Sequence, residues 1–574
     1  MMPRESDTAS AARPHDFGSS AGGWTRAILE VAAILAVFAA AGAWPVPDVN
    51  ETAYLTKARH YADPAWCRGD FFLETPDAHG VFYMLLGPLA ATVSLEQAAW
   101  IGRWLGWLAL AVGFRHAAAP LVTGSWPRII AAALFSLALR HTTAAGEWVI
   151  GGCEAKVFAW ALVLAAIGEL GQARPARAWL ALGAATALHP LVGGWGLVAA
   201  VISWGTGWST SWWKSRWKSR CLPPMNRENP VEHAFKPFQP VPRDMLVSGL
   251  LVSGLLVSAG LLMAAAGVVP AIGLSAGADA AMRAAAARIH VVERLSHHLL
   301  MRTFADGMVA RHLLAIMLWW LLRRLPTAAS PSVEAARMRV DRYVGAALLI
   351  SLAGVAISLL EPFAPNAASS LLRFYWFRLG DVLVPFGLST GAAGVFASDK
   401  ALGMLFPVRP AVMRVVIAVL LSLDLAYESR HWPLPGRTGL VARSDSKVDA
   451  AAWREICDWV VANTPADACF LTPRGAASFT WWTGRREVVG WKNSPQDARS
   501  LIEWRQRFVD CFSRDGSFAN MERSTAALGP DRLRLVADRY GATHAIVPVD
   551  LPGVDTLPFA RLHANTRYAI YQLK

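Results

Sequence analysis

The sequence predicts a mainly α-helical, polytopic membrane protein that ends in a small soluble α/β domain. Hydrophobic residues make up 54% of the 574 residues and charged residues only 17%, whereas a soluble domain has about 25% charged residues. Apolar residues come in long runs of Ala, Leu, Val and Trp up to about residue 427, and the composition then changes to that of a soluble domain. These observations exclude a single soluble enzyme, a disordered chain and a disulfide-stabilised secreted scaffold.

About eleven stretches of the chain predict membrane crossings, since a helix needs about 20 mostly apolar residues to span a bilayer. They lie near 24–43, 96–118, 128–146, 155–172, 178–188, 191–206, 245–266, 308–322, 342–361, 376–397 and 411–427. The pair 178–188 and 191–206 is interrupted by His189-Pro190, so it is either two spans or one re-entrant hairpin. We therefore expect a transmembrane domain over residues 24–430.

The charge balance of the loops predicts the orientation of the chain, because short cytoplasmic loops are rich in Lys and Arg. The insert 207–243 and the loop 323–342 are strongly basic and should be cytoplasmic. The loop 44–80 holds six acidic and three basic residues and should be external. With the N-terminus inside, an odd number of crossings places the C-terminal domain outside the plasma (inner) membrane. The net charge of +13 thus indicates topology and contact with anionic lipid, not a nucleic-acid partner.

The two ends of the chain differ in their expected structure. Residues 1–23 are rich in Ser, Gly and Ala and should form a disordered cytoplasmic tail. Residues 440–574 should form an extracytoplasmic α/β domain, with helical periodicity at 449–463 and 497–512. Short strand-like runs bounded by turn residues lie at 468–472, 543–549 and 568–573. The six cysteines are scattered without zinc spacing, and one disulfide within this domain is left open.

The external loop directly after the first span is the most informative segment for function. It contains Asp48 and Glu51 at the head of an expected helix that ends before Pro64. Carboxylates at a membrane–water boundary are costly to desolvate, so their pKa values would be raised, which suits a general base. The same two residues could instead cap the helix, with Asp48 as the N-cap and Glu51 three residues later. The residues alone leave both interpretations open.

This loop and the segments after it resemble the C-type glycosyltransferases of the membrane (the GT-C fold), such as the protein O-mannosyltransferases and the lipid A aminoarabinose transferases. In that superfamily the first external loop has an Asp-Glu pair and a Tyr three residues later. Asn50-Glu51 and Tyr54 match this pattern except at the first acid. The segment 79–89 and the pair Gly102-Arg103 match the two motifs that follow, and His189-Pro190 stands where the superfamily has Thr-Lys.

The resemblance implies transfer of a sugar from a polyprenyl-phosphate carrier to an acceptor on the outer face of the membrane, with inversion. Because Asn50 replaces the first acid of the pair, Glu51 is the expected general base and Asp48 the second choice. The implied partners are the lipid-linked sugar, the acceptor and the bilayer. The run Thr472-Pro473-Arg474-Gly475 is similar to one in a family of bacterial membrane proteins, which indicates no substrate.

Other polar residues in or near the membrane are candidates for substrate binding, because intramembrane charge is costly and indicates function by default. Arg373 or Arg378 could hold a phosphate, although Arg378 could instead pair with Asp381 on the same helix. Glu154 could be a second acid of the site, or it could only balance the charge of Lys156.

Three further residues belong to the expected site through the resemblance or through their place in a span. Tyr54 is part of the acidic motif. Arg103 lies inside the second expected span and should pair with an acid of the first external loop. His189 could line the cavity, or it could only satisfy carbonyl groups that Pro190 leaves without a donor.

The sequence indicates no cofactor motif, and a divalent metal is the one cofactor left open. His297 and His298 could bind it together with Asp48 or Glu51. Adjacent histidines point to different faces of a helix, however, so an amphipathic helix over 283–303 that lies on the membrane is the alternative.

Two other functions compete with sugar transfer. A transporter or flippase would also have broken helices and buried charges, but no internal repeat relates the two halves of the chain. A non-catalytic membrane scaffold or binding protein of the same fold stays open because Asn50 replaces an acid of the motif.

Overall fold

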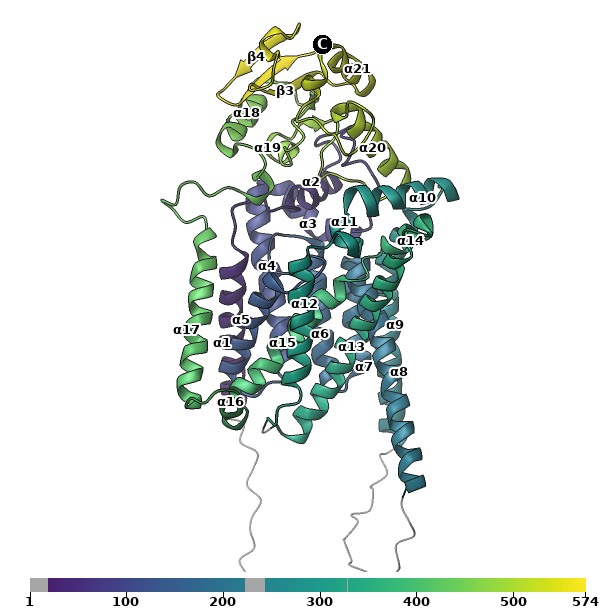
Figure 1. Cartoon of the computed structure of the whole chain (residues 1–574), viewed down its shortest axis with the longest axis vertical. Helices are drawn as coiled ribbons and strands as arrows, with labels where there is room; N and C mark the ends of the chain where they lie inside the picture. Colours follow the sequence, from purple (N-terminus) through teal and green to yellow (C-terminus); the bar gives the residue numbers. More distant parts are fainter. Residues whose placement is uncertain (1–18, 222–242, 328) are drawn as a thin grey trace, which may run out of the picture.

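The computed structural model describes residues 19–221, 243–327 and 329–574. A large helical part forms the body of the molecule, and a smaller part that contains the β-sheet is stacked on one end of it (Figure 1). We call these two ends the sheet end and the opposite end. Most of the expected disordered tail 1–23, and residues 222–242 of the basic insert, lie outside the described residues.

The helical part contains most of the helices of the chain. Its first half consists of α1 (Ser19–Gly42), α2 (Glu51–Ala62), α3 (Gly80–Thr92), α4 (Leu95–Ala118), α5 (Ser125–His141), α6 (Ala155–Gly171), α7 (Pro175–Leu188) and α8 (Pro190–Cys221). Its second half consists of α9 (Arg243–Gly273), α10 (Ala280–Arg288), the π-helix η1 (Ile289–Arg294), α11 (Ser296–Leu299), α12 (Asp306–Leu322), α13 (Pro331–Leu359), α14 (Pro365–Leu372), α15 (Arg378–Ala397), α16 (Asp399–Leu405) and α17 (Pro410–Glu428).

Five helices in the described part of the chain are long and apolar enough to cross a membrane. They are Gly23–Gly42, Leu251–Gly273, Pro331–Leu359, Arg378–Ala397 and Pro410–His431. Each overlaps an expected crossing, and together they make the chain a multi-pass membrane protein. The other expected crossings are also helical, but α5, α6 and α12 have only 17 residues each. The count of about eleven crossings therefore stays a prediction.

Aromatic side chains fill the core of the helical part. Phe114 of α4 is fully buried, and its ring contacts Phe38 of α1, Phe135 of α5 and Phe386 of α15 at centroid distances of 5.8, 5.3 and 5.8 Å. Three of the helices around this core are therefore held to α4 by ring contacts, which add to the gain from burial.

Glycines allow a close crossing of α7 and α9. A Cβ atom placed on Gly183 would lie 2.0 Å from the carbonyl oxygen of Gly260, and one placed on Gly260 would lie 2.7 Å from the carbonyl oxygen of Trp179. Small residues at such positions let two backbones approach, which is a common way for helices to associate in membranes.

The sheet-containing part is built from residues after α17. Its helices are α18 (Ala450–Asn463), α19 (Phe479–Thr483), α20 (Ala498–Phe512) and α21 (Pro530–Tyr540), and its strands are β1 (Cys469–Leu471), β2 (Arg486–Glu487), β3 (His544–Pro548), β4 (Ala560–Ala564) and β5 (Tyr568–Gln572). The strand order is β2-β1-β3-β5-β4. β1 runs parallel to β2 and β3, and β5 runs antiparallel to β3 and β4.

The two faces of the sheet are covered by different helices, because successive side chains of a strand point to opposite faces. Phe470 packs with Trp453 of α18 on one face. Its neighbour Leu471 packs with Trp504 and Phe508 of α20 on the other face. The structure has the helices expected at 449–463 and 497–512 as α18 and α20, and the three expected strands as β1, β3 and β5. That residues 440–574 form a separate extracytoplasmic domain stays a prediction.

The segment that carries α2 and α3, together with α10 and α11, lies between the helical body and the sheet (Figure 1). The Glu487 backbone N–H donates to Asp70 Oδ2 at 3.1 Å, which ties β2 to the loop between α2 and α3. Arg505 of α20 binds both carboxylate oxygens of Glu293, at 2.7 and 3.0 Å. The acidic loop expected to carry the chemistry is therefore covered by the sheet-containing part.

Candidate active site

Glu51 begins α2, and its side chain is completely buried. Arg103 of α4 donates to both of its oxygens, from Nε to Oε1 at 2.7 Å and from Nη2 to Oε2 at 2.6 Å. The backbone N–H of Cys153 donates to Oε1 at 2.6 Å, and that of Asp48 donates to Oε2 at 2.7 Å. Arg103 thus pairs with an acid of the first loop, as expected. Each oxygen of Glu51 already accepts two hydrogen bonds, so the carboxylate joins three segments of the chain.

Asp48 is held by a residue that precedes the sheet. Its Oδ2 accepts from Arg443 Nη2 at 2.5 Å, and its Oδ1 accepts from the Val49 backbone N–H at 2.6 Å. Burial raises the pKa of Asp48, but the charges of Arg443 and Arg103 outweigh it and hold the pKa below its ordinary value. Asp48 is therefore a weak base.

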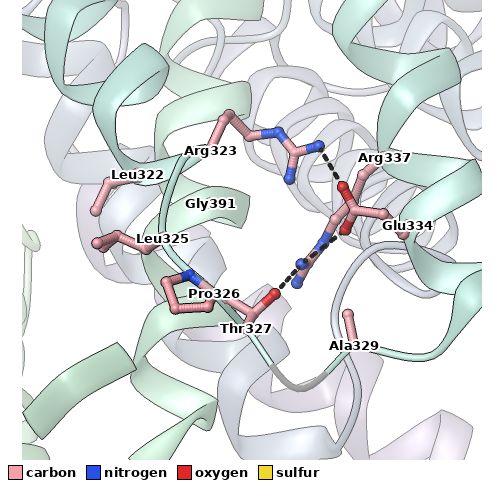
Figure 2. Close-up of a pocket in the computed structure, with 9 residues that line it drawn as sticks. All are labelled: Leu322, Arg323, Leu325, Pro326, Thr327, Ala329, Glu334, Arg337 and Gly391. Carbon is pink, nitrogen blue, oxygen red and sulfur yellow. Dashed lines mark hydrogen bonds and ion pairs between the residues drawn. The ribbon is translucent and has the colours of Figure 1, made fainter. Parts of the chain in front are cut away.

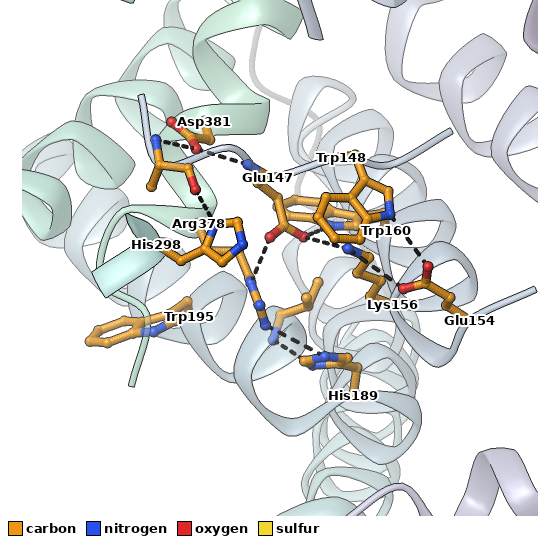
Figure 3. A network of polar contacts seen from close by, with 12 residues as sticks. Glu147, Trp148, Glu154, Lys156, Trp160, His189, Trp195, His298, Arg378 and Asp381 are labelled. Carbon is orange, nitrogen blue, oxygen red and sulfur yellow. Dashed lines mark hydrogen bonds and ion pairs between the residues drawn. The ribbon is translucent and has the colours of Figure 1, made fainter. Parts of the chain in front are cut away.

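A second group of acids surrounds Lys156 at the start of α6 (Figure 3). Glu154 is completely buried and accepts from Asn50 Nδ2 at 3.2 Å and from Trp148 Nε1 at 3.3 Å. Lys156 Nζ lies 3.6 Å from Glu154 Oε2 and 3.8 Å from Glu147 Oε1. Two carboxylates thus share one ammonium group, and Asn50 contacts one of them.

The two glutamates of this group differ in the direction of their pKa shift. Burial raises the pKa of Glu154, the charge of Asp48 raises it further, and Lys156 and the two hydrogen bonds only partly offset this. Burial also favours a raised pKa at Glu147. The charges of Arg378 and Lys156 outweigh burial, however, and lower the pKa of Glu147. Arg378 Nε lies 3.0 Å from Glu147 Oε2. Paired acids whose environments separate their pKa values are typical of acid–base sites.

Arg378 and His189 complete the polar network on the side of the long helices. Arg378 pairs with Glu147 rather than with Asp381, whose Oδ1 instead accepts from the Ala144 backbone N–H at 2.7 Å. His189 Nε2 lies 3.5 Å from Arg378 Nη1, and its Nδ1 accepts from the Val192 backbone N–H at 3.3 Å. Within the described residues, His189 thus accepts from a backbone N–H instead of donating to the carbonyl groups that Pro190 leaves without a donor, and its other nitrogen lies next to Arg378.

Tyr54 and Arg373 lie at the edge of the network. The ring of Tyr54 contacts those of His79 and Phe82, at centroid distances of 5.2 and 5.6 Å. Burial and the charge of Glu154 raise the pKa of Tyr54, so its hydroxyl stays protonated. Arg373 makes no ion pair within the described residues, and its guanidinium lies 5.6 Å from the Phe374 ring centroid. All eight expected site residues therefore lie at the sheet end, but they divide between several contact groups.

Arg294 shares a neighbour, His290, with Arg373, and another cation, Lys492, lies close to Arg294. Arg294 ends the π-helix η1, is buried, has no hydrogen-bond partner at Nε and stacks on Trp491 with 4.6 Å between guanidinium and ring centroid. Burial lowers the pKa of Arg294 to about 10, and burial with the charge of Arg294 lowers that of Lys492 to about 8. We call Arg294, Arg373 and Lys492 the cationic group. No member of it forms an ion pair in the described part of the chain.

Two members of the cationic group, Arg294 and Arg373, lie near a buried pair of rings, those of Tyr375 and His290. Tyr375 has a φ of 57°, which is rare for a residue other than glycine, and its ring lies 5.9 Å from that of His290. Burial and the charges of Arg373 and Arg294 lower the pKa of His290 to about 3, so this histidine is neutral. Strained backbone of this kind is common at binding sites. Sequence patterns could not assemble this group, because its three members are spread over about 200 residues of the chain.

A cavity at the opposite end of the molecule is also lined by arginines (Figure 2). Its volume is about 220 Å³. The Glu334 carboxylate lies 3.4 Å from Arg323 Nη2 and 3.6 Å from Arg337 Nη1. Because Glu334 balances both arginines, this cavity offers less to an anion than the cationic group does.

The histidines of the segment 283–303 do not form a metal cluster. Across residues 19–221, 243–327 and 329–574, no three His, Cys, Asp or Glu side chains are arranged to hold a metal ion. The ring of His298 contacts that of His297 and lies 2.5 Å, at Nδ1, from the Ala145 carbonyl oxygen. The expected single amphipathic helix is wrong, because the segment is divided into α10, η1 and α11.

Comparison with known proteins gives one family match, over part of the chain, and weak likenesses to solved structures, among them ArnT and AftD. A family described as a domain of unknown function (DUF6798) matches residues 451–511, from α18 to α20. No curated protein matches the chain. ArnT from Cupriavidus metallidurans, solved with undecaprenyl phosphate bound, is 13% identical with a TM-score of 0.36, over 97% of this chain and 99% of that one. The mycobacterial arabinofuranosyltransferase AftD is 13% identical with a TM-score of 0.37, over 96% of this chain and 41% of that one.

Proposed function

We propose that the chain transfers a sugar from a polyprenyl-phosphate carrier to a hydroxyl group of an acceptor, with inversion, and that Glu154 is the general base. The observation that carries this proposal is the pair of buried glutamates with opposite pKa shifts beside the unpaired cationic group. A base and a binding site for a departing phosphate are the two parts that such a reaction needs.

Glu154 suits the base role better than Glu51 does. Both oxygens of Glu51 are saturated by Arg103 and by two backbone N–H groups. Glu154 has weaker contacts, of 3.2 Å or longer, and a raised pKa. Asn50 also fits this assignment, because an Asp in its place would put a second carboxylate against Glu154 and remove the amide that now donates to it.

The cationic group suits the leaving phosphate. In the reaction, Glu154 takes the proton of the acceptor hydroxyl, and the acceptor oxygen attacks the anomeric carbon from the face opposite the phosphate. The bond from that carbon to the phosphate oxygen breaks, and the electron pair stays on the phosphate. Arg294, Arg373 and Lys492 would offset that charge in a site where few water molecules compete.

We place the sheet end on the outer face of the plasma (inner) membrane. The opposite end carries the loop with Arg323 and Arg324 and the start of α13 with Arg337, Arg339 and Arg342. Basic residues next to short loops favour the cytoplasmic side. The lipid tail of the donor would lie along apolar helices such as α17, most of whose surface is exposed in the structure.

The experiment that tests this function compares Glu154→Gln with Glu169→Gln. Glu169 lies near the far end of α6 and pairs with His116 at 2.8 Å, so it is a matched control on the same helix. The purified variants in lipid nanodiscs are incubated with polyprenyl-phosphate sugars and cell-envelope extract, and the glycans of producing cells are profiled. Loss of a general base should reduce transfer by about 100-fold or more, with Glu169→Gln near wild type. Equal transfer by Glu154→Gln and the wild type would refute the proposal.

A further inference from the structure

A separate cavity lies where the loop between α2 and α3 meets the sheet-containing part. Its volume is about 360 Å³, and residues 69–76 of the loop form one wall. The other wall comes from β1, β2, α20 and the end of α21. Cavities of about 300 Å³ or more are large enough for small molecules.

Two arginines line this cavity with an unused donor each. Arg486 directs Nε and Nη2 to the Asp467 carbonyl oxygen, and Arg507 directs Nε to Glu503 at 2.9 Å and Nη1 to the Val488 carbonyl oxygen at 3.2 Å. Within the described residues, Arg486 Nη1 and Arg507 Nη2 have no hydrogen-bond partner. Both guanidinium planes are thus fixed while one N–H₂ group of each stays available.

Acceptors and an apolar surface face the same space. Glu74 Oε1 accepts from the Gly69 backbone N–H at 2.6 Å, and its Oε2 has no partner among the described residues. The Asp497 side chain caps α20 by accepting from the Ser500 backbone N–H at 2.9 Å, and among the described residues the Ser500 hydroxyl has no hydrogen-bond partner. Phe71 adds an aromatic ring, which lies 4.0 Å from the Arg507 guanidinium.

Gly69 keeps one of the free donors accessible. A Cβ atom at this position would lie 3.1 Å from Arg486 Nη1, so any larger residue would cover that nitrogen. Gly69 also has a φ of 81°, which side chains rarely adopt. Burial raises the pKa of Glu487, another lining residue, to about 8, so this carboxyl is neutral at pH 7. Glu503 balances Arg507, and Glu74 offsets Arg486, so the lining has little net charge.

We propose that this cavity binds a saccharide of one or two units and that it is the subsite for the acceptor; the second part rests on the proposed function. Hydrogen-bond donors and acceptors that line one cavity together with an aromatic ring match the hydroxyl groups of a sugar better than they match a phosphate, which would need unbalanced positive charge. A chain of contacts connects the cavity to the candidate site. Lys57 Nζ lies 3.0 Å from Thr75 Oγ1 and 3.6 Å from Asp77 Oδ2, and His79, bound to Asp77 at 2.7 Å, has its ring 4.8 Å from that of His189.

The test uses Ser500→Trp, which fills the cavity, and Arg499→Trp, which places the same side chain on the exposed face of α20 one residue earlier. Gly69→Ala is a second variant that covers Arg486 Nη1. The full chain in nanodiscs is titrated with maltose, cellobiose, the N-acetylglucosamine disaccharide, glucuronic acid and inorganic phosphate, by saturation-transfer NMR and calorimetry. We expect at least one of the four saccharide probes to bind, with about tenfold weaker affinity for Ser500→Trp and Gly69→Ala and wild-type affinity for Arg499→Trp.

The outcomes separate this inference from the proposed function. If none of the saccharides binds, if Ser500→Trp binds as well as Arg499→Trp, or if phosphate competes for the cavity, the saccharide site is refuted. Binding of a polyprenyl phosphate is measured on the same samples and should not change in Ser500→Trp. Saccharide binding without any transfer to an acceptor would retain the cavity as a sugar site and would refute only the proposed transferase.

Discussion

Two glutamates of the candidate site, Glu51 and Glu154, are equally buried but differ in their hydrogen-bond partners. Glu51 shares a two-pronged ion pair with Arg103, and both side chains have no exposed surface. Removing one partner of such a pair leaves the charge of the other partner buried and uncompensated. In the proposed function, Glu51 therefore contributes to stability and Glu154 is the general base.

We expect Glu51→Gln to lower the free energy of unfolding by about 3–5 kcal/mol, because it leaves the Arg103 charge without a counterion. Chemical unfolding in detergent measures this. Glu334→Gln is the control, since its side chain is 48% exposed and such pairs contribute less than about 1 kcal/mol. Combining Glu51→Gln with Arg103→Met should restore part of the loss. A Glu51→Gln variant as stable as the wild type would contradict this account.

The raised pKa of Glu154 predicts the pH dependence of transfer. The base must be deprotonated, so the rate should rise with pH through a pKa that lies above the ordinary value of 4.5. Lys156→Met removes the nearest positive charge, which now lowers this pKa, and should move the acid limb of the profile to higher pH. Initial rates between pH 4 and pH 9 measure the limb. A limb that does not move in Lys156→Met, or that moves to lower pH, would contradict the assignment of Glu154.

At the scale of elements, the crossing of α7 and α9 depends on glycines that no pattern of hydrophobic residues reveals. The carbonyl oxygen of Gly260 occupies the space that a side chain at Gly183 would need. The crossing leads directly to His189, which follows the last residue of α7. The position of α7 therefore affects both packing and the polar network.

We expect Gly183→Ala to destabilise the chain by about 1–3 kcal/mol, because the added methyl group overpacks a backbone contact. Gly254→Ala is the matched control on α9, since a Cβ atom there would meet nothing within 4 Å. Unfolding of both variants by SDS or urea in mixed micelles gives the comparison. Equal free energies of unfolding for the two variants would contradict this account of the crossing, because α7 and α9 could then move apart without a loss of stability.

At the scale of the whole molecule, the sheet-containing part closes over the loop that carries Asp48 and Glu51. The contacts are polar and specific, such as Arg443 to Asp48 and Arg505 to Glu293. Lys492 also comes from this part, so the cationic group is complete only when the two parts meet. The sheet-containing part must therefore lie on the same side of the membrane as the loop that carries Asp48 and Glu51.

The proposed orientation, with the sheet end on the outer face of the membrane, can be tested in cells. Alkaline phosphatase fused after Lys574 should be active in a bacterial host, because that enzyme folds only outside the cytoplasm, whereas a fusion within the loop 323–330 should be inactive. We expect the basic residues at this end to keep that loop in the cytoplasm. The reverse pattern of activities would overturn the placement of the sheet end on the outer face.

Sequence reasoning located several elements and part of the site. Apolar runs identified the five helices that are long and apolar enough to cross a membrane, and local periodicity identified α18 and α20. The motif around Glu51 identified the segment where the acids gather, including the partner of Arg103. It did not identify Arg294 or Lys492, which lie on η1 and after β2 and have no local pattern that marks them.

The sequence by itself determined that the chain is a helical membrane protein, because burial in lipid requires long apolar helices whatever their packing. It also determined where acidic and basic residues concentrate along the chain. Only the tertiary structure decided which carboxylate accepts four hydrogen bonds and which one has a raised pKa. The reason is physical: the pKa of a buried acid depends on charges and donors within a few ångströms. For Glu154 these are Asn50, Trp148, Lys156 and Asp48, and Asn50 and Asp48 lie about 100 residues before it in the chain.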